Sequence, residues 1–190
     1  MRSFTDILHS VRLTDKQSIH EYGWMYDLWL PPYRDRATNV VEVGVCHYGG
    51  GSVLALAEYF RNATVWAVDT DRSKCCKYVF DHPRIRFVHG DAYKDGIASL
   101  LPNQIDVVID DCLHEATDQL KLLRLLLPSL ATDGIYVVED CIATDWIRIL
   151  PELWDMGLSH ILVDCQKKGA PGVSCLVKLQ RSKPKTFSWG

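Results

Sequence analysis

The strongest constraint on the fold is a regular alternation between short apolar runs and segments with helical periodicity. Helical patterns are found at 52–59, which opens with a Ser suited to capping, and at 115–130, where leucines recur on one face. The apolar runs are rich in β-branched residues and end near Gly, Asp or Glu, as buried parallel strands do: 39–45, 64–69, 105–110, 134–140 and, more weakly, 85–89. Strand alternating with helix predicts a doubly wound α/β sheet with right-handed crossovers.

The last part of the chain departs from this alternation. Two apolar segments, 158–164 and 172–179, flank a turn-rich connection and predict an antiparallel hairpin at one edge of the sheet. The fold class we predict is therefore α/β, Rossmann-like and doubly wound, with a mostly parallel sheet of seven strands and an antiparallel C-terminal hairpin. Ahead of the sheet, the pattern predicts one helix over 16–30, stopped by Pro31 and Pro32.

Length and hydropathy predict one domain. A chain of 190 residues that is 47% hydrophobic can bury a sizeable core. Within this domain, 1–190, we expect a helical lid segment at 1–35, the Rossmann-like core at 36–180 and a basic tail at 181–190. The N-terminus lacks a signal-peptide core, and no apolar run approaches the ~20 residues that span a bilayer. These features predict a cytoplasmic protein without membrane contact.

Charge and cysteine usage argue against three classes of protein. Lys and Arg total 21 against 24 Asp and Glu, which argues against a nucleic-acid partner bound through massed phosphate contacts. The seven cysteines include no C-x-x-C pair, so neither a zinc ribbon nor a thioredoxin-type site is predicted. Several lie in or beside apolar runs, where a reduced cysteine behaves as a small hydrophobic residue, and we expect reduced thiols.

A glycine-rich loop, 42–52, follows the first predicted strand. Ligands of α/β sheets bind at the carboxyl ends of strands, and glycines there let a ligand approach the backbone. The loop does not fit G-x-G-x-x-G, because Cys46 interrupts the spacing, and no Gly-Lys-Ser/Thr follows to form a phosphate loop. The alternative interpretation is a turn that only connects strand to helix.

Glu42-x-Gly44, followed by clustered glycines, resembles the first motif of class I S-adenosylmethionine-dependent methyltransferases. In that class the loop wraps the methionine and ribose portion of the cofactor. The resemblance implies that Glu42, Gly44, Gly50 and Ser52 contact S-adenosyl-L-methionine.

The next two strand ends agree with this resemblance. Asp69 ends the second strand, where a carboxylate accepts hydrogen bonds from two ribose hydroxyls, whereas Asp71 is better placed to cap a helix. Asp91 and Ala92 follow the third strand, where such enzymes bind adenine. Asp110, at the end of the fourth strand, is also assigned to the cofactor side.

Paired carboxylates end the fourth and fifth predicted strands: Asp110 with Asp111, and Glu139 with Asp140. Neighbouring parallel strands bring such ends within several Å, where carboxylates raise one another's pKa values unless a cation neutralises them. Oxygen ligands suit Mg²⁺, with Mn²⁺ or Ca²⁺ as alternatives. Helix capping explains one residue of each pair but not both pairs, so the sequence predicts a divalent metal site.

The order of these motifs resembles metal-dependent sugar O-methyltransferases of the macrocin and mycinamicin type, together with rhamnosyl O-methyltransferase-like and cephalosporin-hydroxylase-like proteins. The likeness rests on Asp110-Asp111-x-x-His114, Gly134-x-Tyr136-x-x-Glu139-Asp140 and, upstream, Thr14-Asp15-Lys16 with His20-Glu21-Tyr22-Gly23 and Tyr26. It implies that the metal ligands are Asp110, Glu139 and Asp140. Cys112-Leu113 departs from the Gly-Ser that is common in the group, and the short chain argues against a large macrolide pocket.

The reaction implied is methyl transfer to a hydroxyl of a sugar or a glycosylated small molecule. A metal would orient the acceptor and lower its pKa, and His114 or Asp111 is the candidate base. Local packing of His114 at a helix N-terminus is the alternative for that residue. Two other functions stay open: a catechol-type O-methyltransferase, and a non-catalytic protein that binds S-adenosylmethionine. A homodimer is an open alternative to a monomer.

Overall fold

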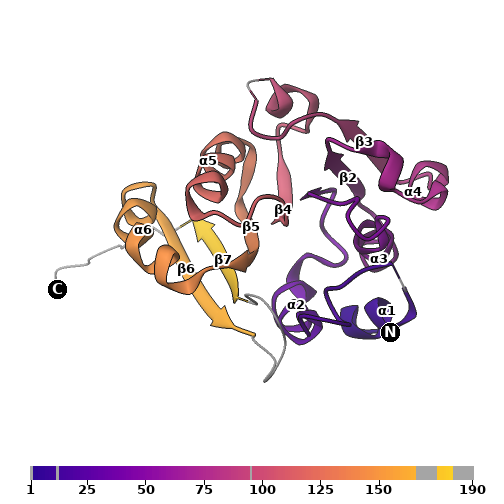
Figure 1. Ribbon diagram of the computed structural model, residues 1–190, viewed down its shortest axis with the longest axis horizontal. Coiled ribbons are helices and arrows are strands. Elements are labelled where there is room, and N and C mark those ends of the chain that lie inside the picture. Colours follow the sequence, from indigo (N-terminus) through magenta and orange to yellow (C-terminus); the bar gives the residue numbers. More distant parts are fainter. Residues whose placement is uncertain (1, 12, 95, 166–174, 182–190) are drawn as a thin grey trace.

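A sheet of seven strands forms the centre of the structure, in the order β3-β2-β1-β4-β5-β7-β6 (Figure 1). This computed structural model describes residues 2–11, 13–94, 96–165 and 175–181. The strands are β1 (Asn39–Val43), β2 (Thr64–Asp69), β3 (Ile85–His89), β4 (Ile105–Asp110), β5 (Leu130–Cys141), β6 (Leu158–Asp164) and β7 (Cys175–Arg181). The first five strands run parallel, and β7 runs antiparallel to both of its neighbours. The predicted fold class is confirmed.

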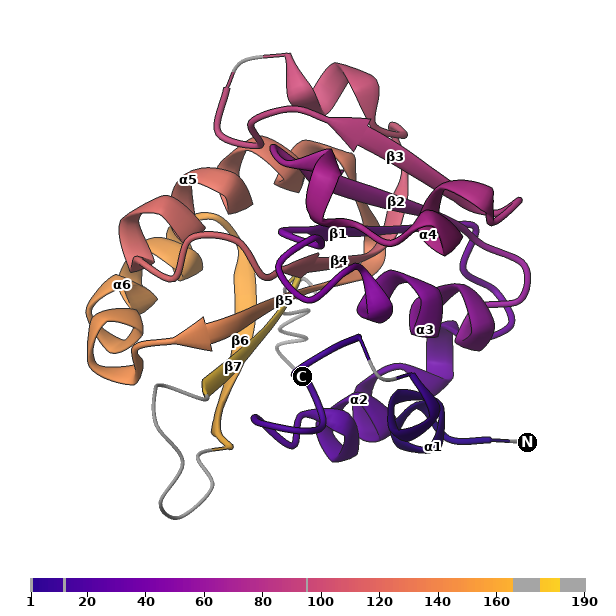
Figure 2. The ribbon, with the colours of Figure 1, turned by 45° about the vertical axis from the view of Figure 1, so that its right-hand side comes forward.

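Helices cover both faces of this sheet. They are α1 (Phe4–Ser10), α2 (Gly23–Trp29), α3 (Gly51–Tyr59), α4 (Lys77–Asp81), α5 (Ala116–Leu126) and α6 (Ala143–Asp155). Figure 2 shows α1, α2 and α3 grouped on one side of the sheet, with α5 and α6 on the other. Within the described part of the chain, no helix combines the length and the apolar character needed to cross a membrane.

The central strands contribute side chains to an apolar core on each face. In β4, Val107 and Ile109 pack with the helices α1 to α3, whereas Val108 packs with α5 and α6. The buried Asp106 of β4 is an exception, since its carboxylate accepts from the amides of Thr38 and Asn39. Successive side chains of a strand point to opposite faces, so a strand covered on both sides is apolar at most positions. This is why the strands appear in the sequence as continuous apolar runs rather than as alternating ones.

The predicted strands at 64–69, 85–89 and 105–110 agree with the structure residue for residue. The first strand is two residues shorter at its end than 39–45 and the fifth begins earlier, at Leu130. The C-terminal hairpin is confirmed by the pairing of β6 with β7. Its connection, and residues 182–190 of the predicted tail, lie outside the described residues.

The prediction of one helix over 16–30 is wrong in its first half. Only Gly23–Trp29 is α-helical, and the preceding residues form turns in which the amide of Tyr22 donates to the carbonyl of Lys16 at 2.7 Å. Glu21 has φ 57°, a left-handed conformation that an α-helix cannot contain. The turns let the side chain of Lys16 be buried, at 2% exposure, instead of lying on a helix surface.

The expectation that all cysteines are reduced is also wrong. Cys46, in the loop after β1, forms a disulfide with Cys75, which follows β2, across a sequence separation of 29. Neither Cys46 nor Cys75 belongs to a C-x-x-C motif, so the spacing of the cysteines in the sequence did not predict this disulfide. The disulfide joins two loops at the carboxyl edge of the sheet.

Removing this disulfide is expected to destabilise the fold. Closing a loop of this length restricts the unfolded chain, so Cys75→Ser should lower the free energy of unfolding by about 2–4 kcal/mol, measured by denaturant titration. Cys76→Ser, which removes the neighbouring free thiol, is the control and should change it little. Equal stability of the Cys75→Ser and wild-type proteins under non-reducing conditions would contradict the prediction.

Candidate functional site

A pocket of about 660 Å³ opens at the carboxyl edge of the parallel strands. Its walls come mainly from the loops after β1 to β4, from Asp140 near the end of β5 and from the segment 13–16. The strand order reverses between β1 and β4, so the connections that leave these strands diverge to opposite faces. In α/β sheets such a divergence creates the crevice where ligands bind.

Most of the predicted site residues line this pocket: Gly44, Ser52, Asp69, Asp91, Ala92, Asp111, His114 and Asp140. Glu42, Gly50, Asp110 and Glu139 are not among the lining residues. Ser52 lies inside α3 rather than at its cap, because Gly50 takes the N-cap position with φ 81°. The pocket therefore brings together the predicted cofactor loop and one member of each predicted carboxylate pair.

Gly44 allows the loops after β1 and β4 to touch. It has φ +86°, and a Cβ at this position would lie 2.0 Å from the carbonyl oxygen of Asp111. Its amide donates to the carbonyl of Val68 at 2.9 Å, and the amide of Asp111 donates to the carbonyl of Val43 at 2.9 Å. Any side chain at 44 would push these loops apart.

Asp69 uses both carboxylate oxygens to hold neighbouring loops. Oδ2 accepts from the amide of Cys46 at 2.8 Å, and Oδ1 accepts from the amide of Asp71 at 2.8 Å. Asp71 itself accepts from the amide of Ser73, as expected for a capping residue. Because a carboxylate oxygen has two acceptor positions, Asp69 retains the capacity to accept from a ligand in the pocket.

The loop after β3 is fixed to the loop after β4. Asp91 accepts from the amide of Tyr93 at 3.0 Å, and the hydroxyl of Tyr93 accepts from the amide of Leu113 at 3.1 Å. Ala92 is buried beside them. The pocket wall beside Asp69 therefore combines the buried Ala92 with the carboxylate of Asp91.

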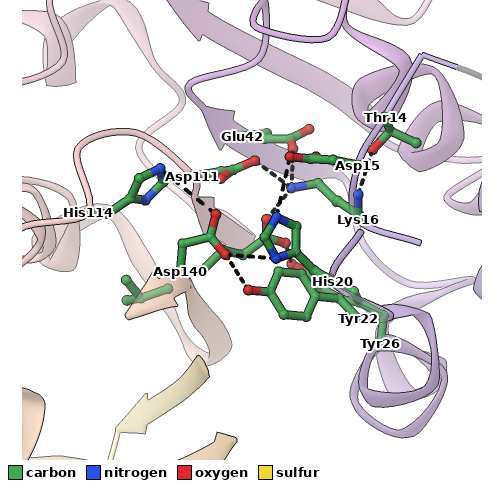
Figure 3. A network of polar contacts seen from close by, with 12 residues as sticks. Thr14, Asp15, Lys16, His20, Tyr22, Tyr26, Glu42, Asp111, His114 and Asp140 are labelled. Carbon is green, nitrogen blue, oxygen red and sulfur yellow. Dashed lines mark hydrogen bonds and ion pairs between the residues drawn. The ribbon is translucent and has the colours of Figure 1, made fainter. Parts of the chain in front are cut away.

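A buried lysine neutralises the carboxylates that gather behind the pocket. Lys16 Nζ lies 2.7 Å from Asp111 Oδ2 and 3.1 Å from Glu42 Oε1, and it also donates to Glu139. Figure 3 shows its side chain reaching between Glu42 and Asp111. Tyr26 donates its hydroxyl to the other oxygen of Glu139. One ammonium is thus shared by three carboxylates.

Opposing effects act on the charge of Lys16. Complete burial favours the neutral amine and lowers the pKa, but the carboxylates of Asp111, Glu139 and Glu42 outweigh burial and hold the pKa of Lys16 well above its usual value. The ammonium therefore stays charged. Because three carboxylates face it, the cluster still has room for further positive charge.

Asp140 lies between two histidines at the mouth of the cluster. Its Oδ1 is 3.6 Å from His20 Nδ1, its Oδ2 is 3.9 Å from His114 Nε2, and Tyr22 donates its hydroxyl to Oδ1. Donor atoms of Asp111, His114 and Asp140 all lie within 4.8 Å of one another. Burial raises the pKa of Asp140, as expected where carboxylates converge.

The backbone at Asp140 is strained. This residue has φ 52°, where a register shift interrupts the pairing of β5 with β7. Left-handed backbone is uncommon outside Gly, Asn and Asp and often marks a functional position. Buried hydrogen bonds hold it in place: Trp146 donates to the side chain of Gln119 at 2.7 Å, and Gln119 donates to the carbonyl of Glu139 at 3.0 Å.

Asp110 lies beneath the pocket floor instead of in the pocket. Its Oδ2 accepts from the hydroxyl of Tyr136 at 3.1 Å, whereas its buried Oδ1 has no hydrogen-bond partner. Burial raises the pKa of Asp110 to about 8. Metal ligation by Asp110 and Glu139 therefore stays a prediction, and the residue of the first pair that reaches the pocket is Asp111.

The sequence placed Lys16 and His20 on the predicted lid helix, and it gave neither residue a role beside the carboxylates. The only signal that links them to the site is the upstream segment that resembles sugar O-methyltransferases. Nothing local in the sequence showed that Lys16 is buried, because its partners are more than twenty residues away along the chain.

The fold and the pocket define a Rossmann-like α/β protein with a pocket at its strand-order reversal. Residues 41–141 match the family described as methyltransferase domain, and the chain belongs to this family. A relative is the 8-demethyl-8-alpha-L-rhamnosyl tetracenomycin-C 2'-O-methyltransferase of Streptomyces olivaceus, 36% identical over 70% of this chain and 36% of that protein. Demethylmacrocin O-methyltransferase of Streptomyces fradiae is 28% identical over 77% of this chain and 40% of its own length. The chain thus spans well under half the length of these relatives.

Solved structures agree on the fold. The MycE methyltransferase from the mycinamycin biosynthetic pathway, in complex with Mg, SAH and mycinamycin VI, matches with a TM-score of 0.75 and 22% identity. The match covers 100% of this chain and 57% of that one. The predicted resemblance to sugar O-methyltransferases is confirmed.

The close contact at Gly44 predicts that replacing this glycine by Ala destabilises the fold much more than the same change at Gly157. Gly157 also has a positive φ, but a Cβ there meets nothing within 4 Å. Gly157→Ala should therefore cost only the strain of left-handed backbone, about 1–2 kcal/mol. Gly44→Ala adds overlap with the Asp111 carbonyl and should cost about 3 kcal/mol or more in free energy of unfolding. Equal costs in denaturant titration would show that the loops do not depend on this contact.

Proposed function

We propose that this domain is an S-adenosylmethionine- and divalent-metal-dependent O-methyltransferase that acts on a hydroxyl of a sugar or a glycosylated small molecule. The observation that carries the proposal is the shared pocket. Asp69 and Asp91 line one side of it, and Asp111, His114 and Asp140 line the other. The choice of acceptor is supported by the names of two relatives, a rhamnosyl tetracenomycin-C 2'-O-methyltransferase and a demethylmacrocin O-methyltransferase. Because those proteins are much longer, the acceptor of the whole protein is part of the proposal.

The residues of the first side fit a nucleoside cofactor. Asp69 can accept from ribose hydroxyls while it holds the loop of Cys46, and Asp91 can accept from the polar edge of adenine beside Ala92. The volume of about 660 Å³ is within the usual range for ligand pockets and leaves room for an acceptor next to the cofactor.

The residues of the second side fit a divalent cation. The carboxylates of Asp111 and Asp140 offer oxygen atoms within 4.8 Å of each other, which suit Mg²⁺ or Mn²⁺, and His114 lies beside them without being needed as a ligand. The cluster behind them carries more carboxylates than cations, so a further positive charge is favoured there. A bound ion would orient an acceptor hydroxyl and lower its pKa.

His114 is the base we assign to the acceptor. Its Nε2 faces Asp140 Oδ2 at 3.9 Å, which leaves Nδ1 to accept the hydroxyl proton. Asp140 then stabilises the imidazolium that forms, as carboxylates do for catalytic histidines. Bound S-adenosylmethionine would supply the methyl group, whose bond to sulfur would break as the C–O bond forms, while His114 would keep the hydroxyl proton. The half-exposed position of His114 allows this proton to leave to solvent.

Cofactor binding is expected to depend on Asp69. Asp69→Asn removes a charged acceptor, so calorimetry should show S-adenosylmethionine binding about tenfold to a hundredfold weaker than in the wild-type protein. Asp81→Asn, on the exposed side of α4, is the control and should bind as the wild type does. The cofactor assignment fails if the wild-type protein shows no binding, or if Asp69→Asn binds equally well.

If Asp140 holds a metal ion, replacing it by Asn should weaken cation binding while leaving the stability of the fold nearly unchanged. Asn tolerates left-handed backbone, so Asp140→Asn should keep the free energy of unfolding within about 1 kcal/mol of wild type. It removes one charge from the ligand set and should weaken Mn²⁺ binding at least about tenfold. Asp145→Asn, nearby on α6 but outside the pocket, is the control. Unchanged Mn²⁺ affinity would remove Asp140 from the site.

Acceptor screens test the reaction itself. A panel of glycosides and nucleotide sugars should yield methylated products, and EDTA should abolish their formation. Transfer that persists after chelation would reject the metal role. Transfer only to vicinal aromatic diols would favour the catechol-type alternative, and cofactor binding without transfer to either panel would favour a non-catalytic protein.

A further inference from the structure

We propose that Lys16 is a built-in counter-cation of the acceptor site, which holds Asp111 in place before a divalent ion binds and limits how tightly that ion is held. This role rests on the proposed function, since it assigns Lys16 a task at the proposed cation site. Lys16 does not contact the methyl group or the acceptor hydroxyl of the proposed reaction. It acts through Asp111, so it is a positioning residue.

The geometry places one ammonium at the centre of the cluster. Lys16 Nζ contacts Glu42, Asp111 and Glu139, and its side chain is only 2% exposed. Glu42 and Glu139 are at most 1% exposed. Among the residues that the structure describes, no other Lys, Arg or His forms an ion pair with these two glutamates. Burying such carboxylates without a cation is costly, so the cluster requires this ammonium.

The segment that carries Lys16 is fixed in position. The amide of Gly51, at the start of α3, donates to the carbonyl of Leu13 at 2.8 Å. A Cβ on Gly51 would lie 2.1 Å from that same oxygen, so the contact is as close as backbone allows. The carbonyl of Lys16 accepts from the amide of Tyr22. The ammonium is therefore held on a fixed backbone rather than on a loose N-terminal arm.

Asp111 links the ammonium to the pocket. Its Oδ2 faces Lys16, and the residue also belongs to the set with His114 and Asp140. A divalent ion in that set would share Asp111 with Lys16 and would be repelled by its charge. The lysine thus lets the site fold without metal while it weakens metal binding.

Thermal unfolding with and without Mg²⁺ tests this role without any assay of activity. In EDTA, the midpoint temperature of unfolding of the wild-type protein should lie close to its value in Mg²⁺. In EDTA, Lys16→Met should unfold several degrees below the wild-type protein. Mg²⁺ should restore most of this loss, because the ion then neutralises the carboxylates that have lost their ammonium partner. Lys77→Met, which removes an exposed lysine of α4, should behave as the wild type does. A loss that Mg²⁺ does not restore, or no loss at all, would overturn the proposal.

Cation affinity provides the second measurement. Mn²⁺ should bind Lys16→Met at least tenfold more tightly than wild type or Lys77→Met, because a repelling charge has been removed. Equal or weaker binding would overturn the proposal. If the wild-type protein binds neither Mn²⁺ nor S-adenosylmethionine, the proposed function fails. The comparison of unfolding temperatures in EDTA still tests whether Lys16 stabilises the carboxylate cluster.

A second variant covers the case in which Lys16→Met does not fold. Lys16→Met with Glu42→Gln removes one charge of each sign, so it should fold in EDTA more readily than Lys16→Met alone. In this double variant Mn²⁺ binding should still exceed wild type, because Asp111 is freed from the ammonium. A double variant no more stable than the single one, or one that binds Mn²⁺ no better than wild type, would overturn the proposal.

Discussion

The structure depends on how it neutralises acid groups that its own sheet brings together. Parallel strands end at one edge, so Glu42, Asp111 and Glu139 converge there by topology and not by local sequence. Buried carboxylates repel one another, and their charge loses the solvation that water provides. The turns before α2 exist in the form observed because they deliver the ammonium of Lys16 to this point.

The pocket is held by contacts between loops instead of by helices alone. Gly44 touches the loop of Asp111, Asp69 holds the loop of Cys46, and the Cys46–Cys75 disulfide joins the loops after β1 and β2. Each contact links loops at the ends of neighbouring strands, so these loops form one connected rim around the pocket. A rim of this kind positions side chains on adjacent loops with the accuracy that catalysis requires.

The sequence predicts the fold well because buried parallel strands carry a strong local signal. It predicts the pocket almost as well, because loops at strand ends carry the ligand residues of α/β sheets. It does not distinguish Asp110 from Asp111. Both come at the end of a run that is apolar except for Asp106. Since every residue of β4 is buried, the sequence pattern lacks the polar alternation that would show which carboxylate faces the pocket. Lys16 and the disulfide were missed for a different reason, since both depend on distances between segments that no local pattern contains.

The left-handed backbone at Asp140 has a consequence for how this position can change over evolutionary time. Gly, Asn and Asp are the residues that adopt such a backbone at low cost, and Asp is the one among them with a negative charge. Glu preserves the charge but strains the chain, whereas Asn and Gly preserve the chain but discard the charge. Under the proposed function, substitutions that the fold accepts at this position are therefore the ones that remove the proposed metal ligand. A relative with Asn or Gly at this position should keep an intact fold but lack the charge that the proposed metal site needs.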